Sequence, residues 1–214
     1  MALGTESSGG TWLSVVKGNL TQRVKAGTEG AVERTIEKGP NTGSVVHELQ
    51  YNFLEGRLER VYIQETEYGK SWVFVVDDGQ KAYNLVVSYS SGYAVGLLSR
   101  LPNVDLSDTI RIKSFYIKGD DDKYRGYLTI QQGGQKVEKA FSKEEPNGLP
   151  EIERITVNGQ PQWDSTKRME FFERLVEKSI NPGIKEANPL AGVPDEVPDP
   201  DISDAPPEED DLPF

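Results

Sequence analysis

The stretch Tyr89-Ser-Ser-Gly-Tyr-Ala-Val-Gly-Leu-Leu-Ser-Arg-Leu101 interrupts an otherwise unbroken series of strand-like segments. Its apolar residues Tyr93, Leu97, Leu98 and Leu101 recur at spacings of three and four, which is the pattern of a short amphipathic helix. On both sides of it, β-branched and aromatic residues occur in short runs separated by turn signals. The sequence therefore predicts one helix inserted into a mainly β domain.

The strand-like segments lie between Val45 and Phe141, and we expect them at 45–65, 70–77, 80–88, 108–118, 124–132 and 135–141. Gly56 lies in the middle of the first segment, where a bend or bulge would let one long strand serve two sides of a small barrel. Asp77-Asp78-Gly79-Gln80 predicts a tight hairpin turn. Three strands, a helix and two further strands is the order of the oligonucleotide/oligosaccharide-binding (OB) fold, a five-stranded Greek-key barrel plugged at one end by the helix. We expect this barrel over about 45–141.

The flanking segments predict a loose N-terminus over 1–10 and a folded domain over 11–181. Residues 11–38 predict a hairpin-like β elaboration with several basic residues, diluted by glutamates. Ile152 to Val157 predicts one short hairpin, and Asp164 or Ser165 can cap a helix over about 164–180. We expect the apolar stripe of this helix, which contains Met169 and Phe172, to pack onto the domain. Asn181-Pro182-Gly183 predicts the end of the helix.

Composition argues against an enzyme. The chain has no Cys and a single histidine, His47, so thiolate metal sites, cysteine nucleophiles and imidazole clusters are excluded or disfavoured. Asp120-Asp121-Asp122 predicts a hairpin turn before it predicts a metal site. We expect no cofactor and no metal. No long apolar run and no secretory leader is evident, which predicts a cytosolic protein.

Residues 182–214 predict a disordered acidic tail. The last 20 residues carry nine of the 35 carboxylates, no Lys or Arg, and several prolines, so they cannot build a core. The chain ends with an acidic lead and an apolar tip, formed by Asp210, Asp211, Leu212, Pro213 and Phe214. Such a tip suits a pocket that pairs an apolar hole with basic residues. The alternative is a tail that only solubilises the protein.

Alternation along the last two barrel strands separates a core face from a mixed face. Ile110 and Ile112 take one parity, while the other carries Arg111, Lys113 and Phe115, joined in the next strand by Arg125 and Tyr127. Cations that track phosphates and rings that stack on bases are what single-stranded nucleic acid requires. Four further candidates have a parity that does not decide between this surface and the core, and they are Trp72, Tyr62, Lys81 and Tyr83.

These features resemble the single-stranded DNA-binding proteins of bacteria and bacteriophages. The resemblance rests on the strand order over 45–141, the proline-containing linker and the tip ending in Leu212-Pro213-Phe214. It implies a non-catalytic protein of the bacterial cytoplasm, including that of an infected host, which coats single-stranded DNA during replication, recombination and repair. It also implies that the tip recruits a polymerase, helicase or recombinase, and that the chain forms a homo-oligomer. The additional segment 11–44 and the short linker are more similar to a bacteriophage member, and they put the usual homotetramer in doubt.

Three other interpretations remain at this stage. The barrel could bind another protein while the tail only solubilises, it could prefer RNA, or carboxylates could support an undetected nuclease. Salt-dependent binding to oligo-dT separates the first of these from DNA binding, because neutralised phosphates release counterions. Whether a 2′-hydroxyl strengthens or weakens binding separates a preference for RNA from DNA binding.

Overall fold

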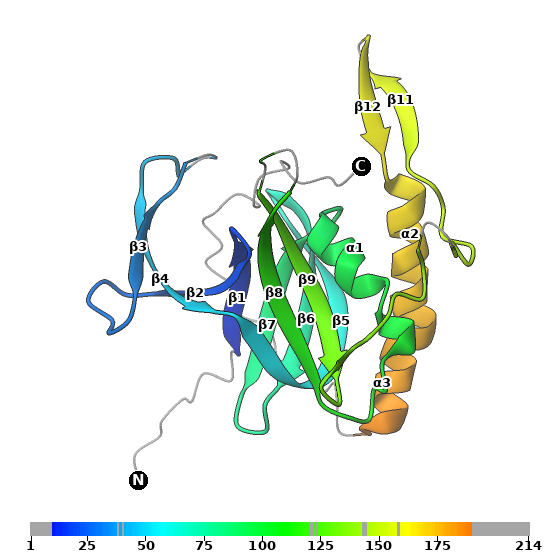
Figure 1. Cartoon of the computed structure of the whole chain (residues 1–214), viewed down its shortest axis with the longest axis horizontal. Coiled ribbons are helices and arrows are strands. Elements are labelled where there is room, and N and C mark those ends of the chain that lie inside the picture. Colours follow the sequence, from blue (N-terminus) through cyan, green and yellow to red (C-terminus); the bar gives the residue numbers. More distant parts are fainter. Residues whose placement is uncertain are drawn as a thin grey trace.

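The computed structural model describes residues 10–189, except positions 38, 40, 120, 121, 123, 143, 144 and 158. The predicted N-terminal segment 1–9 and the tail from 190 onwards, including the tip Asp210 to Phe214, lie outside the described residues. The described chain is mainly β, with one large mixed sheet and helices packed against it (Figure 1).

The centre of the sheet follows the predicted order of three strands, a helix and two strands. The elements are β5 (Phe53–Thr66), β6 (Gly69–Asp77), β7 (Ala82–Ser88), α1 (Gly92–Leu98), β8 (Ile110–Lys118) and β9 (Tyr124–Gln132). A short 3-10 turn, η1 (Leu101–Asn103), follows α1. Neighbouring strands in the order β9-β8-β5-β6-β7 are all antiparallel.

The long first strand serves two partners, as its glycine predicted. Phe53 to Gly56 pair with β8, whereas Arg57 to Thr66 pair with β6. Gly56 stands at the change of partner, where a Cβ would run into the carbonyl of Asp77. The predicted single strand 45–65 is nevertheless broken at Asn52, whose carbonyl accepts hydrogen bonds from the backbone N–H and the hydroxyl of Ser114 at 3.0 and 3.1 Å.

Residues 11–51 add four strands to the sheet, three of them within 11–38, where a hairpin-like elaboration was expected, and the fourth within the predicted strand 45–65. They are β1 (Thr11–Val16), β2 (Asn19–Val24), β3 (Val32–Thr35) and β4 (Val45–Tyr51). Lys17 and Gly18 both have positive φ and form the tight turn between β1 and β2. β1 pairs in parallel with β7, so β7 has β6 on one edge and β1 on the other.

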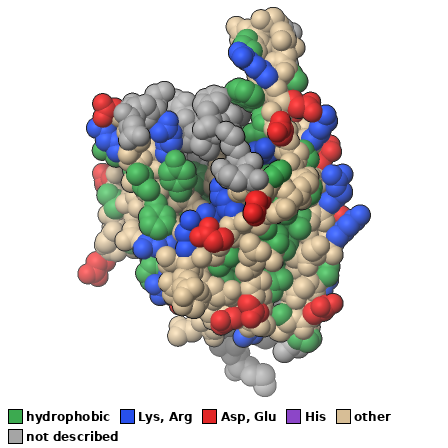
Figure 2. Space-filling model, turned by 45° about the vertical axis from the view of Figure 1, so that its right-hand side comes forward, with side chains coloured by type: hydrophobic (Ala, Val, Ile, Leu, Met, Phe, Trp, Pro, Cys, Tyr) green, Lys and Arg blue, Asp and Glu red, His purple; other side chains and the backbone are tan. Residues whose placement is uncertain are grey.

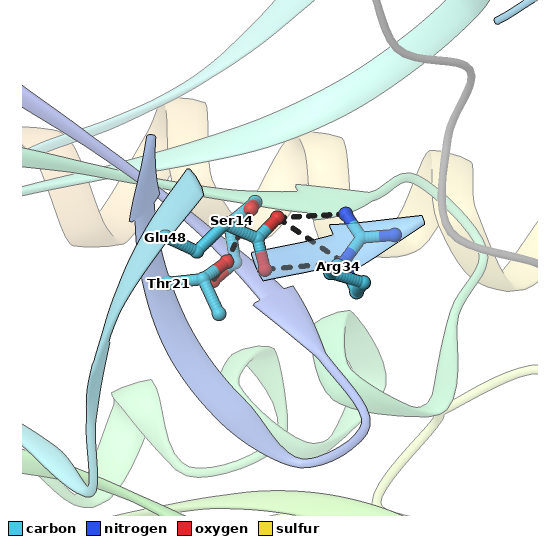
Figure 3. A network of polar contacts seen from close by, with 4 residues as sticks. All are labelled: Ser14, Thr21, Arg34 and Glu48. Atoms are coloured by element: carbon cyan, nitrogen blue, oxygen red, sulfur yellow. Dashed lines mark hydrogen bonds and ion pairs between the residues drawn. The ribbon is translucent and has the colours of Figure 1, made fainter. Parts of the chain in front are cut away.

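A buried ion pair holds the outer strands of this N-terminal unit together (Figure 3). The guanidinium of Arg34 on β3 donates to both carboxylate oxygens of Glu48 on β4, with the shortest contact at 2.7 Å. The Glu48 side chain is 2% exposed. The hydrogen bond with Glu48 raises the pKa of Arg34. Beside this pair, the hydroxyls of Ser14 and Thr21 lie 2.8 Å apart and join β1 to β2.

The core lies between the inward face of the sheet and the helices. The helix α1 begins at Ser91, whose hydroxyl accepts from the Ala94 N–H at 3.2 Å, and it packs against β9 and β7. Its predicted apolar positions Leu97 and Leu98 are fully buried. The helix α2 (Thr166–Leu175) adds Met169 and Phe172 to the same core, which confirms that its apolar stripe packs onto the domain.

The helical segment does not end at Asn181, as the Asn-Pro-Gly sequence predicted. It passes through a π-helical turn, η2 (Val176–Ile180), into α3 (Asn181–Ala187). Pro182 occupies the first turn of α3, where a missing N–H costs little, and the π-helical turn before it absorbs the irregularity. Gly183 allows a close approach of Leu106. None of the described helices is long and apolar enough to cross a membrane.

Two further strand predictions are corrected in detail. The strand expected at 135–141 is reduced to β10 (Gln135–Lys136), because Ala140 bonds instead to the carbonyl of Ser99 at the end of α1. The hairpin expected around 152–157 is formed by β11 (Glu153–Val157) and β12 (Gln160–Asp164), which make a separate two-stranded sheet.

Candidate functional site

The outward face of β5, β8 and β9 gathers aromatic and basic side chains. Strand register places Phe53 opposite Lys113, and Phe115 opposite Tyr127. Side chains directly opposite each other in antiparallel strands lie on the same face. The inward positions of these strands, including Leu54, are buried in the core. We call the outward face the ring–cation face and define it by Phe53, Arg111, Lys113, Phe115, Arg125 and Tyr127.

Cations lie against rings on this face. The guanidinium carbon of Arg111 is 4.6 Å from the centroid of the Phe53 ring, and Nζ of Lys113 is 5.1 Å from the centroid of Phe115. Phe53 is 49% exposed and Tyr127 41% exposed. An exposed ring beside a cation offers an apolar face for stacking and a charge for a nearby anion, while the cation remains close to its own ring.

The basic side chains of the ring–cation face differ in how far a neighbouring carboxylate neutralises their charge. Glu55 lies directly opposite Arg111, accepts a hydrogen bond from its Nε at 2.7 Å and forms an ion pair with its Nη2 at 2.5 Å. The positive charge of Arg111 is therefore partly compensated.

Thr129 lies opposite Lys113, is 6% exposed, and its hydroxyl has no hydrogen-bond partner within the described structure. A buried hydroxyl without a partner is uncommon and adds an unused polar group beside this face.

Two rings that sequence alternation missed lie near the β8–β9 turn, on the inward parity of these strands and so on the face opposite Phe115 and Tyr127. Tyr116 and Tyr124 stack with centroids 5.1 Å apart, and both are about half exposed. Tyr116 has the same parity as the buried Ile112, but here β8 extends beyond the core, so its inward face also becomes accessible. Gly18 in the β1–β2 turn packs against it, since a Cβ there would lie 2.6 Å from Cβ of Tyr116. Figure 2 shows hydrophobic and basic side chains next to one another on one face of the protein.

Phe53 was also missed, although its signal was present in the sequence. The alternation that buries Leu54 and Leu58 places Phe53 on the outward parity with Glu55. Its cationic neighbour Arg111 comes from a strand far along the chain, so only the pairing of β5 with β8 shows the two together.

The structure brings five of the nine predicted binding residues onto the ring–cation face. These are Arg111, Lys113, Phe115, Arg125 and Tyr127. A sixth, Tyr62, lies on the outward face of β5 opposite Val73, with the guanidinium of Arg60 4.6 Å from its ring centroid. Partial burial raises the pKa of Tyr62, and the charge of Arg60 opposes this shift.

Trp72 has to be removed from the candidate set. It is 1% exposed, its ring stacks on Tyr89, and its Nε1–H donates to the carbonyl of Tyr89 at 3.1 Å. A side chain with no accessible ring face cannot stack on a base. The reason lies in the register, because Trp72 is opposite Ile63 and Val87 on the core side of the sheet.

Lys81 and Tyr83 are placed at the β6–β7 turn and not on the ring–cation face. The hydroxyl of Tyr83 bonds to Asp78 at 3.1 Å, and Nζ of Lys81 lies 4.7 Å from the Tyr83 ring centroid. Asp78 also accepts from the backbone N–H groups of Gln80 and Lys81, and these backbone bonds lower its pKa. The ring of Tyr83 therefore supports a turn.

Comparison of the chain with known protein families, with curated proteins and with solved structures finds no match.

Proposed function

We propose that the chain is a non-catalytic, sequence-independent single-stranded DNA-binding protein whose sheet forms an OB-type barrel. The observation that carries this proposal is the ring–cation face, where two pairs of opposed residues place rings and cations on one surface. Each base stacked on such a ring contributes about 1–3 kcal/mol of binding free energy, and every base has an aromatic face, so no sequence preference is required.

The strand pairings support the OB-type assignment. A long first strand that divides between β8 and β6 at Gly56, followed by α1 between the third and fourth strands, is the arrangement of that barrel. The chain differs at one edge, where β7 pairs with β1. α1 packs between β7 and β9, which in the standard barrel approach each other.

The proposal extends to the acidic tail. Its tip, Asp210 to Phe214, would recruit replication or recombination proteins such as a polymerase, helicase or recombinase through a basic pocket with an apolar hole. Removing Phe214 should leave the affinity for single-stranded DNA unchanged and abolish capture of such partners. Loss of DNA affinity in this variant would contradict a separate role for the tip.

The primary experiment measures fluorescence anisotropy of labelled oligo-dT at two salt concentrations, with duplex DNA and RNA as competitors. The unaltered chain should bind in a salt-dependent manner and prefer single-stranded DNA. Phe115→Ala and Tyr127→Ala should each weaken binding by about tenfold, in the range expected for one lost stacking contact. Tyr68→Ala, which removes an exposed ring at the β5–β6 turn, is the matched control and should have no effect.

Other outcomes identify the alternative functions. Tighter binding of an RNA oligonucleotide would assign the face to RNA, since a 2′-hydroxyl then contributes to recognition. No salt-dependent binding to any nucleic acid would leave a protein-interaction module. If both ring variants lose thermal stability and not affinity, the rings serve the fold.

A further inference from the structure

The β11–β12 hairpin is held in place without being packed. It follows β10 and precedes α2 along the chain, forms a sheet of its own and projects beyond the body of the protein (Figures 1 and 2). Most of its described side chains are exposed, on both faces. An isolated two-stranded hairpin is marginally stable in water, so such an element gains little from hydrophobic burial.

Contacts at its base nevertheless fix its orientation. Lys167 on α2 forms an ion pair with Glu153 at 2.5 Å, and Asp164 at the end of β12 accepts from the N–H of Thr166 at 2.8 Å. Nε of Arg168 donates to the carbonyl of Pro150 at 2.9 Å. The adjoining helix is anchored in the core by Met169 and Phe172. The hairpin is therefore tethered at its base to a helix that packs into the core.

The hairpin presents one large ring beside one cation. Trp163 lies opposite Arg154, is 46% exposed, and has the guanidinium carbon 5.9 Å from its ring centroid. This repeats the chemistry of the ring–cation face, where Arg111 flanks Phe53 and Lys113 flanks Phe115. Trp offers the largest aromatic surface of any side chain, and leaving it half exposed on an unpacked hairpin contributes nothing to the core.

The hairpin also lies at the relevant end of the molecule. In Figure 1 the β8–β9 turn and the β11–β12 hairpin both point toward the upper end. Tyr116, Tyr124 and Phe115 belong to the parts of β8 and β9 nearest that turn. A strand that leaves the ring–cation face beyond Phe115 would thus run toward the end of the molecule from which Trp163 projects.

We propose that the β11–β12 hairpin is a second contact for single-stranded nucleic acid, in which Trp163 stacks on a base and Arg154 pairs with a neighbouring phosphate. This inference rests on the proposed function and specifies the path of the strand, from the ring–cation face to the hairpin. A short oligonucleotide fills only the face. A longer one reaches the hairpin as well.

The test compares Trp163→Ala with the unaltered chain on oligo-dT of about 8 and about 35 nucleotides, the first within and the second well above the roughly 4–16 nucleotides that one barrel covers. We expect the affinity for the longer oligonucleotide to fall about tenfold and that for the shorter one to stay unchanged. Gln162→Ala, the exposed neighbour on the other face of the hairpin, is the matched control and should retain both affinities. Thermal unfolding of all three proteins checks that the hairpin change leaves the core intact.

A second readout uses tryptophan emission in a Trp12→Phe background, where Trp72 is buried and Trp163 is exposed. The longer oligonucleotide should quench this emission and the shorter one should not. Equal affinities of Trp163→Ala and the unaltered chain at both lengths, with no quenching, would overturn the inference while leaving the proposed function intact if Phe115→Ala still weakens binding. Failure of the unaltered chain to bind single-stranded nucleic acid would overturn both.

Discussion

The side chain of Asn181 completes the hydrogen bonding of Val61. The Val61 N–H donates to Oδ1 of Asn181 at 3.0 Å, and Nδ2 of Asn181 donates to the Val61 carbonyl at 2.8 Å. Val61 is fully buried on β5, on the section that has left β8 and pairs only with β6. The side-chain amide of Asn181 thus takes the place of a neighbouring strand along this free edge of β5. This contact explains why the Asn-Pro-Gly sequence begins a helix here.

Asn181→Ala should lower the free energy of unfolding by about 2 kcal/mol, because it leaves two buried backbone groups without partners. Asn181→Asp keeps an acceptor for the N–H and loses the donor, so it should show a smaller but measurable loss. Asn188→Ala is the control, since its partner Glu59 can return to water. Denaturant unfolding measures all three, and equal stability of the Asn181 and Asn188 variants would contradict this role.

Arg34→Ala should destabilise the N-terminal strands by about 3 kcal/mol, because it leaves the buried carboxylate of Glu48 without its guanidinium. We expect this loss of stability to lie at the low end of the range for broken buried ion pairs, since the Arg34 side chain is 25% exposed. The double change Arg34→Met with Glu48→Leu should recover most of the loss, as apolar replacements of buried pairs often do.

The readout is hydrogen exchange of β2 and β4 together with global unfolding, because these strands can open before the core does. Lys17→Ala, which breaks the exposed ion pair with Glu37, is the comparison and should cost less than about 1 kcal/mol. A loss for Arg34→Ala no larger than that for Lys17→Ala would show that the buried pair adds nothing.

Gly126→Ala should destabilise the domain by about 1–3 kcal/mol through overpacking. A Cβ at position 126 would run into the hydroxyl of Tyr93, which lies on α1 beneath β9. Shortening the opposing side chain with Tyr93→Leu should make the added methyl less costly. A double-mutant cycle checks this, and simple additivity of the two changes would place the strain elsewhere.

Glu55→Gln should strengthen binding of single-stranded DNA several-fold at low salt, because it frees Arg111 from its carboxylate partner. The slope of log affinity against log salt should steepen by about 0.7 for the one additional phosphate contact. Lys113→Ala should change the slope by the same amount in the opposite direction.

The control for this prediction is Glu138→Gln, which removes the same charge beside Lys136, past β10. Anisotropy titrations at several salt concentrations give the slopes. If Glu138→Gln matches Glu55→Gln, the effect comes from net charge and not from Arg111.

Alternation was sufficient to predict the ring–cation face wherever one side of a strand had to be apolar. Ile110 and Ile112 are buried, and Arg111 between them points outward, because β8 has a core on one side only. In β6 both parities are apolar, so periodicity could not place Trp72, and only the register with Ile63 puts it in the core.

Other features depended on contacts between distant segments. The bonds between Asn181 and Val61 have no local signature, and the Asn-Pro-Gly sequence therefore predicted a helix end where a helix continues. Tyr116 shares the parity of the buried Ile112, and nothing in the sequence shows that β8 continues past the core and leaves this ring exposed. The outward rings of β8 and β9 followed from local pattern, whereas the length of each strand beyond the core did not.

The parallel pairing of β1 with β7 also constrains the order of assembly. Thr11 to Leu13 are synthesised well before Tyr83 to Leu85, the residues beside which they lie. The hairpins of β5, β6 and β7 need only short loops, whereas this pairing must close a long one, which is slow. During synthesis Ser14 to Val16 can pair with β2 at once, whereas Thr11 to Leu13 stay without a partner strand until β7 has emerged. In that interval they present an unpaired edge to other chains.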